Sequence, residues 1–573
     1  MGAVGAGSTR FWRAICVNIL LVFSFALSSC DPVPVPTPIS TPGPIKVKIS
    51  NPGIETAIAR VIGTNQIDDL DQNDLAVYSC EDNQYISVWA PDHLIGIIDC
   101  DGSSVYSITL TALDGNDNLN YNWASASMCR NCHSDIQGRT EYLEWSKDGH
   151  SREFGDSYFW NMYMGTDING NTVGPGFRLD HPNENGNCAY CHAPSAVKVS
   201  QQGTLLDSNL SAEGIICDVC HKVRDILLGN NLRPFVDHPG ILSFSFVRPD
   251  SYEPFYVGPL VDPKPEALQI LADNKINTTC FPVFSESKFC AACHYGKFFD
   301  TVIYNSYGEW LESPYRQKNI VSGNGKVAEE NPNYRSCQDC HMLYPEKIGQ
   351  TLPSERDACS NTNLNFRDFS HNMMKYGPDP DNPSQEISLL IRDAATIGIT
   401  AKVEEGKIKV QVTVTNTRAG HKFPTDSPLR HLILLVEAKD ESDSPLAQVE
   451  GPVIPLWGAK DYAGRAGVIY ANILKEQQSN TAPTFAYWNL TEPAWQNSDT
   501  RLSPGIQVPS EYSFAAPSNG DAKITANLIY RYAFFDLADQ KGWYRPDIPV
   551  TSAAWECIRL TDPIGFECKP QVK

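Results

Sequence analysis

Residues 128–151 read MCRNCHSDIQGRTEYLEWSKDGHS and contain the pattern Cys-x-x-Cys-His. The pattern occurs five times in the chain, at Cys129/Cys132/His133, Cys188/Cys191/His192, Cys217/Cys220/His221, Cys290/Cys293/His294 and Cys337/Cys340/His341. A zinc site needs a second pair of ligands and does not require a histidine directly after the second cysteine. A thioredoxin-like thiol pair would occur once, on a βαβ unit. Covalent haem c explains every position, because two thiols form thioethers with the porphyrin and the adjacent imidazole binds its iron. The sequence therefore predicts five attached haems, each with a proximal histidine.

The N-terminal 44 residues predict export and a lipid anchor. Arg10 and Arg13 precede an apolar run over residues 14–27, which is short for a membrane span and typical of a signal peptide. The run is followed by Ser-Ser-Cys at Cys30, an ending that looks like a bacterial lipobox. We expect a signal peptide over residues 1–29, lipid on Cys30 and a Pro-rich tether over residues 30–44. The protein would then be held on the outer side of a bacterial membrane, in the periplasm or at the cell surface. An ordinary signal peptide with an incidental cysteine is the alternative.

The cysteines outside the haem motifs and the N-terminal segment predict disulfides. They are Cys80, Cys100, Cys280, Cys359, Cys557 and Cys568. An even number in an exported protein allows up to three disulfides. Cys80–Cys100 and Cys557–Cys568 are natural local pairs and leave Cys280–Cys359, although the sequence alone does not fix this connectivity.

Composition and strand patterns divide the exported chain into three domains of a mixed fold. Residues 45–120 contain short strand patterns and no haem motif, and resemble a small immunoglobulin-like β-sandwich of the carboxypeptidase-regulatory kind. Residues 121–380 hold all five motifs in Gly-, Pro- and Asn-rich chain, so we expect a pentahaem domain with few short helices and much irregular chain. Residues 381–573 return to strand patterns and predict a C-terminal β-sandwich.

Two strand patterns in the C-terminal region specify their inward faces. Alternation places Ile408, Val410, Val412 and Val414 on one face of residues 407–415. In residues 397–403 it places Ile397, Ile399, Ala401 and Val403 on one face. We expect both faces to point into the core of this domain.

The sixth iron ligand decides whether such a protein only carries electrons or also performs chemistry. Seven histidines lie outside the motifs: His93, His150, His181, His238, His371, His421 and His431. His93 is far from the motifs in sequence and His431 begins an expected strand, so neither is an expected ligand. The other five are our candidates for distal ligands.

The stretch CRNCHSDIQGRTEYLEWSKDGHS resembles the opening haem unit of a family of multihaem cytochromes. This family is related to the tetrahaem electron acceptor of ammonia oxidisers and to hydroxylamine oxidoreductase. The resemblance implies that Trp145 packs on a haem and that His150 binds iron from the distal side. The fourth motif is followed by a similar Glu309-Trp310, but Tyr315 stands where His150 would be.

The resemblance extends to residues 419–438, AGHKFPTDSPLRHLILLVEA, which look like the Gly-His-x-Phe-Pro-Thr element that opens the C-terminal β-domain of the family. It implies that His421 reaches back over a haem and that His371 occupies the usual place of a distal ligand after the last motif. His181, just upstream of the second motif, and His238, just downstream of the third, rest on position alone. All five motifs end in His, unlike pentahaem nitrite reductase, in which a Lys marks the catalytic haem.

Composition and motifs favour an electron-transfer protein. The formal charge is −21, and haem propionates would add negative charge, so nucleic acid is not an expected partner and a basic redox protein is a favourable one. Our main hypothesis is an envelope-anchored pentahaem cytochrome that relays electrons in anaerobic or extracellular respiration. The alternative is an oxidoreductase with one open haem acting on a small nitrogen or sulfur compound, with proton donors such as Tyr315 or Arg316.

Overall fold

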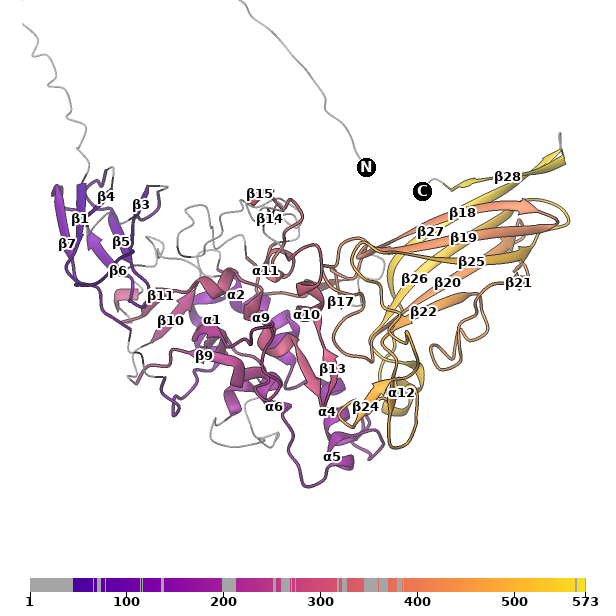
Figure 1. Ribbon diagram of the computed structural model, residues 1–573, viewed down its shortest axis with the longest axis horizontal. Coiled ribbons are helices and arrows are strands. Elements are labelled where there is room, and N and C mark those ends of the chain that lie inside the picture. Colours follow the sequence, from indigo (N-terminus) through magenta and orange to yellow (C-terminus); the bar gives the residue numbers. More distant parts are fainter. Residues whose placement is uncertain are drawn as a thin grey trace, which may run out of the picture. The chain divides into compact units, whose positions relative to one another are not determined.

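The computed structural model describes residues 45–571, apart from short gaps of which the longest are 198–212, 259–267, 345–358 and 360–368. The predicted signal peptide, the lipobox cysteine and the tether lie outside the described residues. The fold is mixed, and strands contribute about twice as many residues as helices do (Figure 1). Within the described part of the chain, no helix is long and apolar enough to cross a membrane.

The N-terminal region consists of two small sheets. One has the strand order β4-β1-β7 and the other β3-β2-β5-β6. The strands are β1 (Ile45–Ile49), β2 (Ile58–Val61), β3 (Ile67–Asp69), β4 (Asp74–Val77), β5 (Tyr85–Trp89), β6 (Gly96–Asp99) and β7 (Val105–Ile108). In β1 the apolar residues alternate with lysines, and Ile45, Val47 and Ile49 are buried while the lysines face outward. Strands therefore form where the sequence pattern predicted them.

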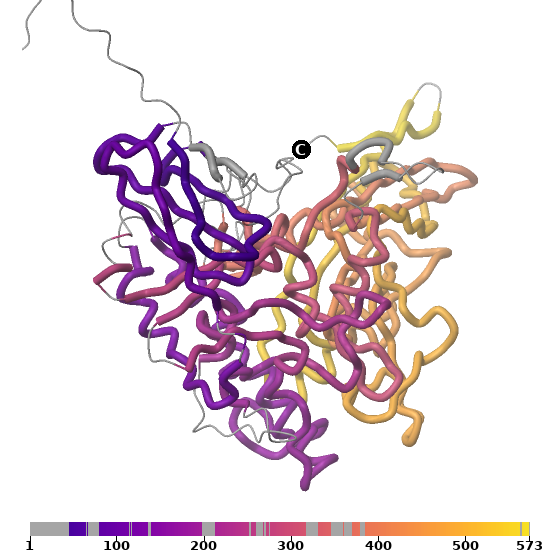
Figure 2. Tube along the Cα trace, turned by 60° about the vertical axis from the view of Figure 1, so that its left-hand side comes forward, coloured from indigo at the N-terminus to yellow at the C-terminus, as the bar shows by residue number. Residues whose placement is uncertain are grey.

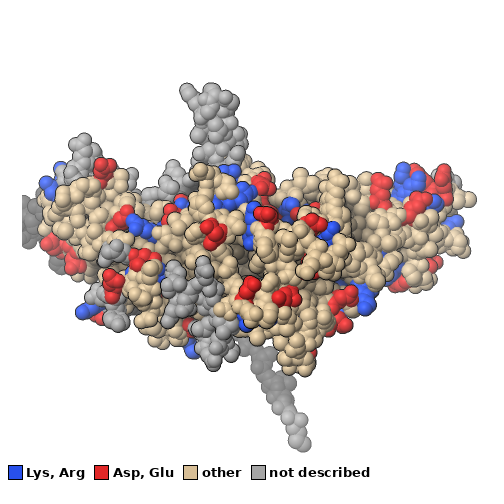
Figure 3. Space-filling view, turned by 60° about the horizontal axis from the view of Figure 1, so that its bottom comes forward, with Lys and Arg blue, Asp and Glu red and all other residues tan. Residues whose placement is uncertain are grey.

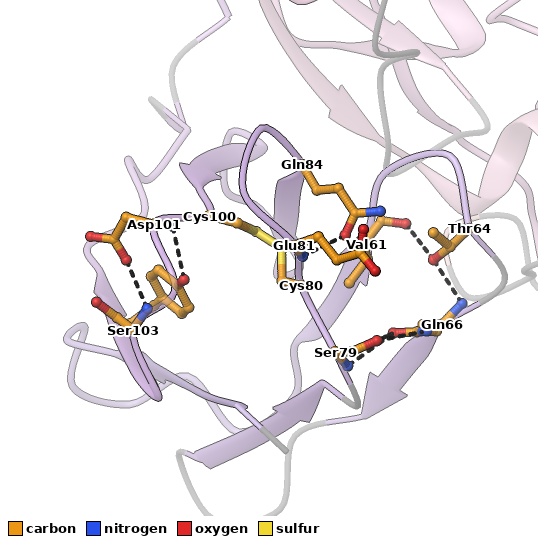
Figure 4. The surroundings of a disulfide bond; sticks show 11 residues. Val61, Thr64, Gln66, Ser79, Cys80, Glu81, Gln84, Cys100, Asp101 and Ser103 are labelled. Carbon is orange, nitrogen blue, oxygen red and sulfur yellow. Dashed lines mark hydrogen bonds between the residues drawn. A yellow bond between two sulfur atoms is a disulfide. The ribbon is translucent and has the colours of Figure 1, made fainter. Parts of the chain in front are cut away.

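The Cys80–Cys100 disulfide closes this region near the start of β5 (Figure 4). Gln84 accepts a hydrogen bond from the backbone N–H of Glu81 at 2.7 Å, which fixes the turn after Cys80. On the other side, the backbone N–H of Ser103 donates to Asp101 at 3.0 Å. The other two expected pairs, Cys280–Cys359 and Cys557–Cys568, also form, so the predicted connectivity is confirmed.

The central region has short helices joined by irregular chain, as expected for residues 121–380 (Figure 2). Its α-helices are α1 (Ala126–His133), α2 (Glu141–Lys147), α3 (Gly149–Arg152), α4 (Ser157–Met164), α5 (Phe177–Asp180), α6 (Ala189–His192), α7 (Cys217–Cys220), α9 (Lys288–His294), α10 (Ser306–Leu311) and α11 (Cys337–His341). Its 3-10 turns are η1 (Pro194–Ala196), η2 (Gly240–Ser243) and η3 (Pro282–Ser285). Each of the five motifs lies on a helix of one or two turns or extends one residue beyond its end.

Short strand pairs connect these helices. They are β8 (Val223–Ile226) with β9 (Phe244–Phe246), β10 (Phe255–Gly258) with β11 (Asn277–Cys280), β12 (Gly296–Phe298) with β13 (Thr301–Tyr304), β14 (Asn319–Val321) with β15 (Val327–Glu330), and β16 (Tyr376–Pro378) with β17 (Glu386–Ser388). The core between the helices is rich in aromatic side chains, among them Trp145, Phe154, Tyr163 and Phe177. Aromatic packing here replaces the extended sheets of the flanking regions.

The C-terminal region contains two larger sheets, ordered β18-β19-β25-β21 and β22-β20-β26-β27-β28, and a short pair β23-β24. The elements are β18 (Ala395–Glu404), β19 (Lys407–Asn416), β20 (His431–Asp440), β21 (Gln448–Glu450), β22 (Gly467–Ala471), β23 (Leu474–Glu476), β24 (Thr491–Pro493), β25 (Gln507–Ala515), β26 (Ala522–Arg531), α12 (Phe535–Lys541), β27 (Ile548–Thr561) and β28 (Ile564–Pro570). Side chains from both larger sheets share one hydrophobic core. The predicted inward faces of β18 and β19 contribute to this core, so both strand predictions are confirmed.

Lys541, at the end of α12, joins this region to the central one. Its side chain is fully buried, and Nζ donates to the backbone oxygens of Asn161 (3.0 Å), Val173 (3.0 Å) and Pro175 (2.7 Å). The indole N–H of Trp543 donates to Asn161 Oδ1 at 2.8 Å. A buried ammonium needs such acceptors, because its charge is costly away from water.

Candidate haem-binding sites

Each Cys-x-x-Cys-His motif places its three reactive side chains on one short helical segment. Positions i, i+3 and i+4 of a helix share a face, so the two thiols and the imidazole point the same way. All ten motif cysteines are free of disulfides, unlike the other six described cysteines. The thiols are therefore available for thioether bonds, and the motif histidine lies next to the second thiol, as a proximal iron ligand requires.

The five motif histidines are oriented through Nδ1. Nδ1 lies within hydrogen-bond distance of Glu141 for His133 (2.9 Å), Glu153 for His192 (2.9 Å), the Val257 carbonyl for His221 (2.7 Å), Asp426 for His294 (3.0 Å) and the Met373 carbonyl for His341 (3.1 Å). An acceptor at Nδ1 fixes the tautomer and leaves Nε2 as the metal-binding nitrogen. The residues present thus fit a haem iron at every motif.

Three motif histidines face a second imidazole at a distance that would fit one iron between the two rings. Ring centres are 6.4 Å apart for His221 and His371, 6.3 Å for His341 and His421, and 6.1 Å for His294 and His150. A metal–imidazole bond is about 2 Å long, so two rings on opposite sides of one metal have centres roughly 6 Å apart. The third, fourth and fifth motifs therefore each have a histidine placed to be a distal ligand.

The orientation of the two rings differs among these pairs. The rings are inclined by 25° in His221–His371 and 23° in His341–His421, and by 69° in His294–His150. Nδ1 of His150 lies 2.6 Å from Asp148, and Nδ1 of His421 lies 2.8 Å from the Lys422 carbonyl. The local hydrogen bonds of the two distal candidates therefore repeat the pattern seen for the motif histidines.

The first and second motifs have no such partner. All twelve histidines lie in the described part of the chain, and none of them has a ring contact of this kind with His133 or His192. The ring of His192 instead stacks on Phe159, with centres 4.0 Å apart. These two motifs therefore differ from the other three in their surroundings.

The remaining four histidines lie elsewhere. Nε2 of His181 is 3.0 Å from Asn489 Oδ1, and the half-exposed His238 pairs with Asp237 at 2.9 Å. His93 lies on the surface and contacts the Pro91 carbonyl, whereas His431 is buried and stacks on Phe534. His181 and His238 remain predictions as iron ligands, and the structure does not bring either to a motif histidine.

The motifs lie next to one another in a defined order. Thiols of different motifs lie close enough to shift one another's pKa: those of the first and third motifs (Cys129–Cys217), the second and fourth (Cys191–Cys293) and the fourth and fifth (Cys290–Cys337). Adjacent thiols require adjacent attachment points. The chain therefore brings haem-binding motifs that are distant in sequence into contact.

Among the described residues, the other four motif thiols are not paired in this way. Burial raises the pKa of Cys188 and of Cys220 to about 12 and that of Cys340 to about 11. Cys132, the second thiol of the first motif, is only partly buried on α1 and has no disulfide. Among the described residues, the structure brings no thiol of another motif to Cys132. Its predicted thioether bond therefore rests on the motif itself and stays a prediction.

Burial and hydrogen bonding shift the pKa values of the motif imidazoles in different directions. Burial lowers the pKa of His221 and of His341 to about 4, and their Nδ1 atoms bond only to carbonyls. Burial also opposes protonation of His294, but the hydrogen bond with Asp426 and the negative charges of Asp426 and its neighbours together raise the pKa of His294 to about 9. A carboxylate partner makes an imidazole a more electron-rich ligand than a carbonyl partner does. The sequence did not reveal these partners, although Asp426 follows the Phe-Pro-Thr element directly.

A family model described as "Cytochrome c554 and c-prime" matches residues 128–222, which include the first three motifs. No curated protein matches the chain. Among solved structures, a penta-haem cytochrome c552 from Thermochromatium tepidum is 18% identical, with a TM-score of 0.47 over 76% of this chain and 98% of that chain. The Fcho1 Mu homology domain of Danio rerio with bound Eps15 peptide is 8% identical, with a TM-score of 0.12 over 26% of this chain and 41% of that one.

TM-scores below 0.5 do not establish a shared fold, so the identification rests on the motifs and the family match. The matched region contains three Cys-x-x-Cys-His helices with oriented histidines. The chain is a multihaem c-type cytochrome.

Proposed function

We propose that the chain binds five haems and relays single electrons between redox proteins. When bound, haem c supplies reversible one-electron chemistry at its iron. The observation that carries this proposal is the set of three imidazole pairs, with ring centres 6.1–6.4 Å apart, on motifs that lie near one another in the fold. Two histidines on one iron leave no site for a substrate, and adjacent attachment points favour transfer from one motif to the next.

The finer features of the proposal have separate support. A relation to the tetrahaem acceptor of ammonia oxidisers and to hydroxylamine oxidoreductase is supported by the quoted motifs, and a C-terminal sandwich by the core that the two larger sheets share. Anchoring through lipid on Cys30 rests on the N-terminal pattern, and a role in respiration rests on the low reduction potentials that we expect from irons with two histidine ligands. On the face in Figure 3, acidic and basic side chains are interspersed. We therefore expect that the net negative charge of the whole protein, and not a single acidic patch, attracts a basic redox partner.

The haem content tests the proposal. Protein matured in a host that attaches haem c should contain five haems per chain by the pyridine haemochrome assay and by intact mass. Replacement of both cysteines of the fifth motif, Cys337→Ser with Cys340→Ser, should reduce the content to four, because each haem depends on its own thiols. A content below five in the wild-type chain would contradict the assignment of every motif to a haem.

A second candidate function follows from the first and second motifs. His133 and His192 face no second imidazole among the described residues, and we propose as the alternative that one of their irons would have an open position for a small nitrogen or sulfur compound. Binding of nitric oxide or cyanide to the oxidised or reduced protein, followed by turnover with nitrite, hydroxylamine or sulfite, tests it. If no haem binds these probes, the enzyme hypothesis is wrong and the relay alone remains.

A further inference from the structure

Two segments of the chain make the same contacts around different pairs of motifs. Nε1 of Trp145 donates to the carbonyl of Ile215, and Nε1 of Trp310 donates to the carbonyl of Arg335, both at 2.8 Å. In each case the acceptor lies two positions before the first cysteine of another motif, the third and the fifth respectively. Each tryptophan therefore ties its own helix to the start of a second haem-binding helix.

The correspondence continues at the residue five positions after each tryptophan. The backbone N–H of Ile215 donates to the carbonyl of His150 at 2.8 Å, and that of Arg335 donates to the carbonyl of Tyr315 at 3.1 Å. The motifs joined in this way are also motifs whose thiols lie close to one another, first with third and fourth with fifth. The chain thus contains one two-motif unit built twice, although the sequence of the second differs at Tyr315.

The glutamate before each tryptophan has an equivalent role in the two units. Oε2 of Glu144 accepts the backbone N–H of His371 at 2.7 Å. Oε2 of Glu309 accepts the backbone N–H of Lys422, next to His421, at 3.2 Å and the Thr425 hydroxyl at 2.6 Å. Each carboxylate therefore holds the turn that carries the second imidazole of its own unit.

The other carboxylate oxygen is fixed in both units, so neither glutamate is free to turn away. Oε1 of Glu144 accepts the hydroxyls of Thr140 at 2.8 Å and Tyr344 at 2.7 Å. Oε1 of Glu309 is ion-paired with Arg501 at 2.8 Å, and the side chains are 3% and 8% exposed. Hydrogen bonds to an ionised acceptor are short and strong, which suits a group that holds a turn in place.

We propose that Glu144 and Glu309 are equivalent positioning residues that hold His371 and His421 in reach of the irons of the third and fifth motifs. The proposal rests on the proposed function in one respect, namely that these two histidines are distal ligands. It adds that each ligand turn is placed by a hydrogen-bonded carboxylate and not by the histidine ring alone. The Glu-Trp dipeptide is the sequence signal of this arrangement.

Variants at the two glutamates test the proposal in the haem-loaded protein. Glu309→Ala and Glu144→Ala should each convert one haem from low-spin to high-spin in electron paramagnetic resonance spectra and create one new site for exogenous imidazole. Glu309→Gln and Glu144→Gln should retain the low-spin signal, because the amide oxygen still accepts the backbone N–H. Glu312→Ala is the matched control, since Glu312 follows the same helix and its side chain is 71% exposed.

Unchanged spin states in both alanine variants, with full haem content and native circular dichroism, would overturn the proposal. Equal losses in the alanine and glutamine variants would also overturn it, because the effect would then come from the lost charge. Failure of the proposed function has a different signature: the third and fifth haems would already be high-spin in the wild-type protein.

Discussion

His421→Ala should leave the iron of the fifth motif with one histidine ligand. The ring of His421 lies 6.3 Å from that of His341, and its Nδ1 is held 2.8 Å from the Lys422 carbonyl, so no rearrangement is needed to bind the metal. We expect one haem per chain to become high-spin, and added imidazole to restore the low-spin form. Visible absorption and electron paramagnetic resonance spectra of the oxidised protein measure both changes.

His93→Ala is the control for this experiment. His93 contacts the Pro91 carbonyl, and it has no ring contact with a motif histidine among the described residues. Its replacement should leave the spectra of all haems unchanged. If His421→Ala behaves like this control while the haem content stays constant, another side chain is the distal ligand of the fifth motif.

Lys541→Met should destabilise the junction between α12 and the central region. Methionine has a similar volume but no donor, so one buried and two partly buried carbonyls would each lose a charged hydrogen bond. An unsatisfied buried polar group costs about 1–3 kcal/mol, and we expect the free energy of unfolding to fall by about 3–5 kcal/mol in total. Chemical denaturation of the haem-loaded protein, followed by circular dichroism, measures the difference.

Lys402→Met provides the reference for a surface lysine. Lys402 forms an ion pair with Glu404, and its side chain is 65% exposed, so its replacement should change stability by less than about 1 kcal/mol. Equal stability of the two variants would show that the buried ammonium does not stabilise the junction.

The strongest predictions from the sequence were those that depend on neighbouring residues. The thioether cysteines and the proximal histidines follow from a five-residue pattern, which is the only support for a thioether bond at Cys132. The buried faces of β18 and β19 follow from the alternation of apolar residues. The disulfides Cys80–Cys100 and Cys557–Cys568 join cysteines only 20 and 11 residues apart, so both were natural local pairs. Cys280–Cys359 spans 79 residues and was the pair left over, which the sequence alone did not fix.

Pairing of histidines with motifs is a different problem, because it depends on contacts between distant segments. The sequence suggested His150 as a distal ligand but could not show that it faces His294 of the fourth motif instead of the first. Likewise, Asp426 and Glu309 contact residues more than a hundred positions away, at His294 and in the ligand turn. His181 and His238 rested on sequence position alone, and the structure brings neither to a motif histidine.

Low-temperature electron paramagnetic resonance of the oxidised wild-type protein tests the central claim most directly. The two pairs with rings inclined by 25° and 23° should give rhombic low-spin signals, each worth one haem. The His294–His150 pair, inclined by 69°, should give a more anisotropic low-spin signal, because nearly perpendicular rings bring two iron orbitals close in energy. A high-spin signal from the first or second motif is compatible with this account. A high-spin signal that integrates to more than two haems would contradict it.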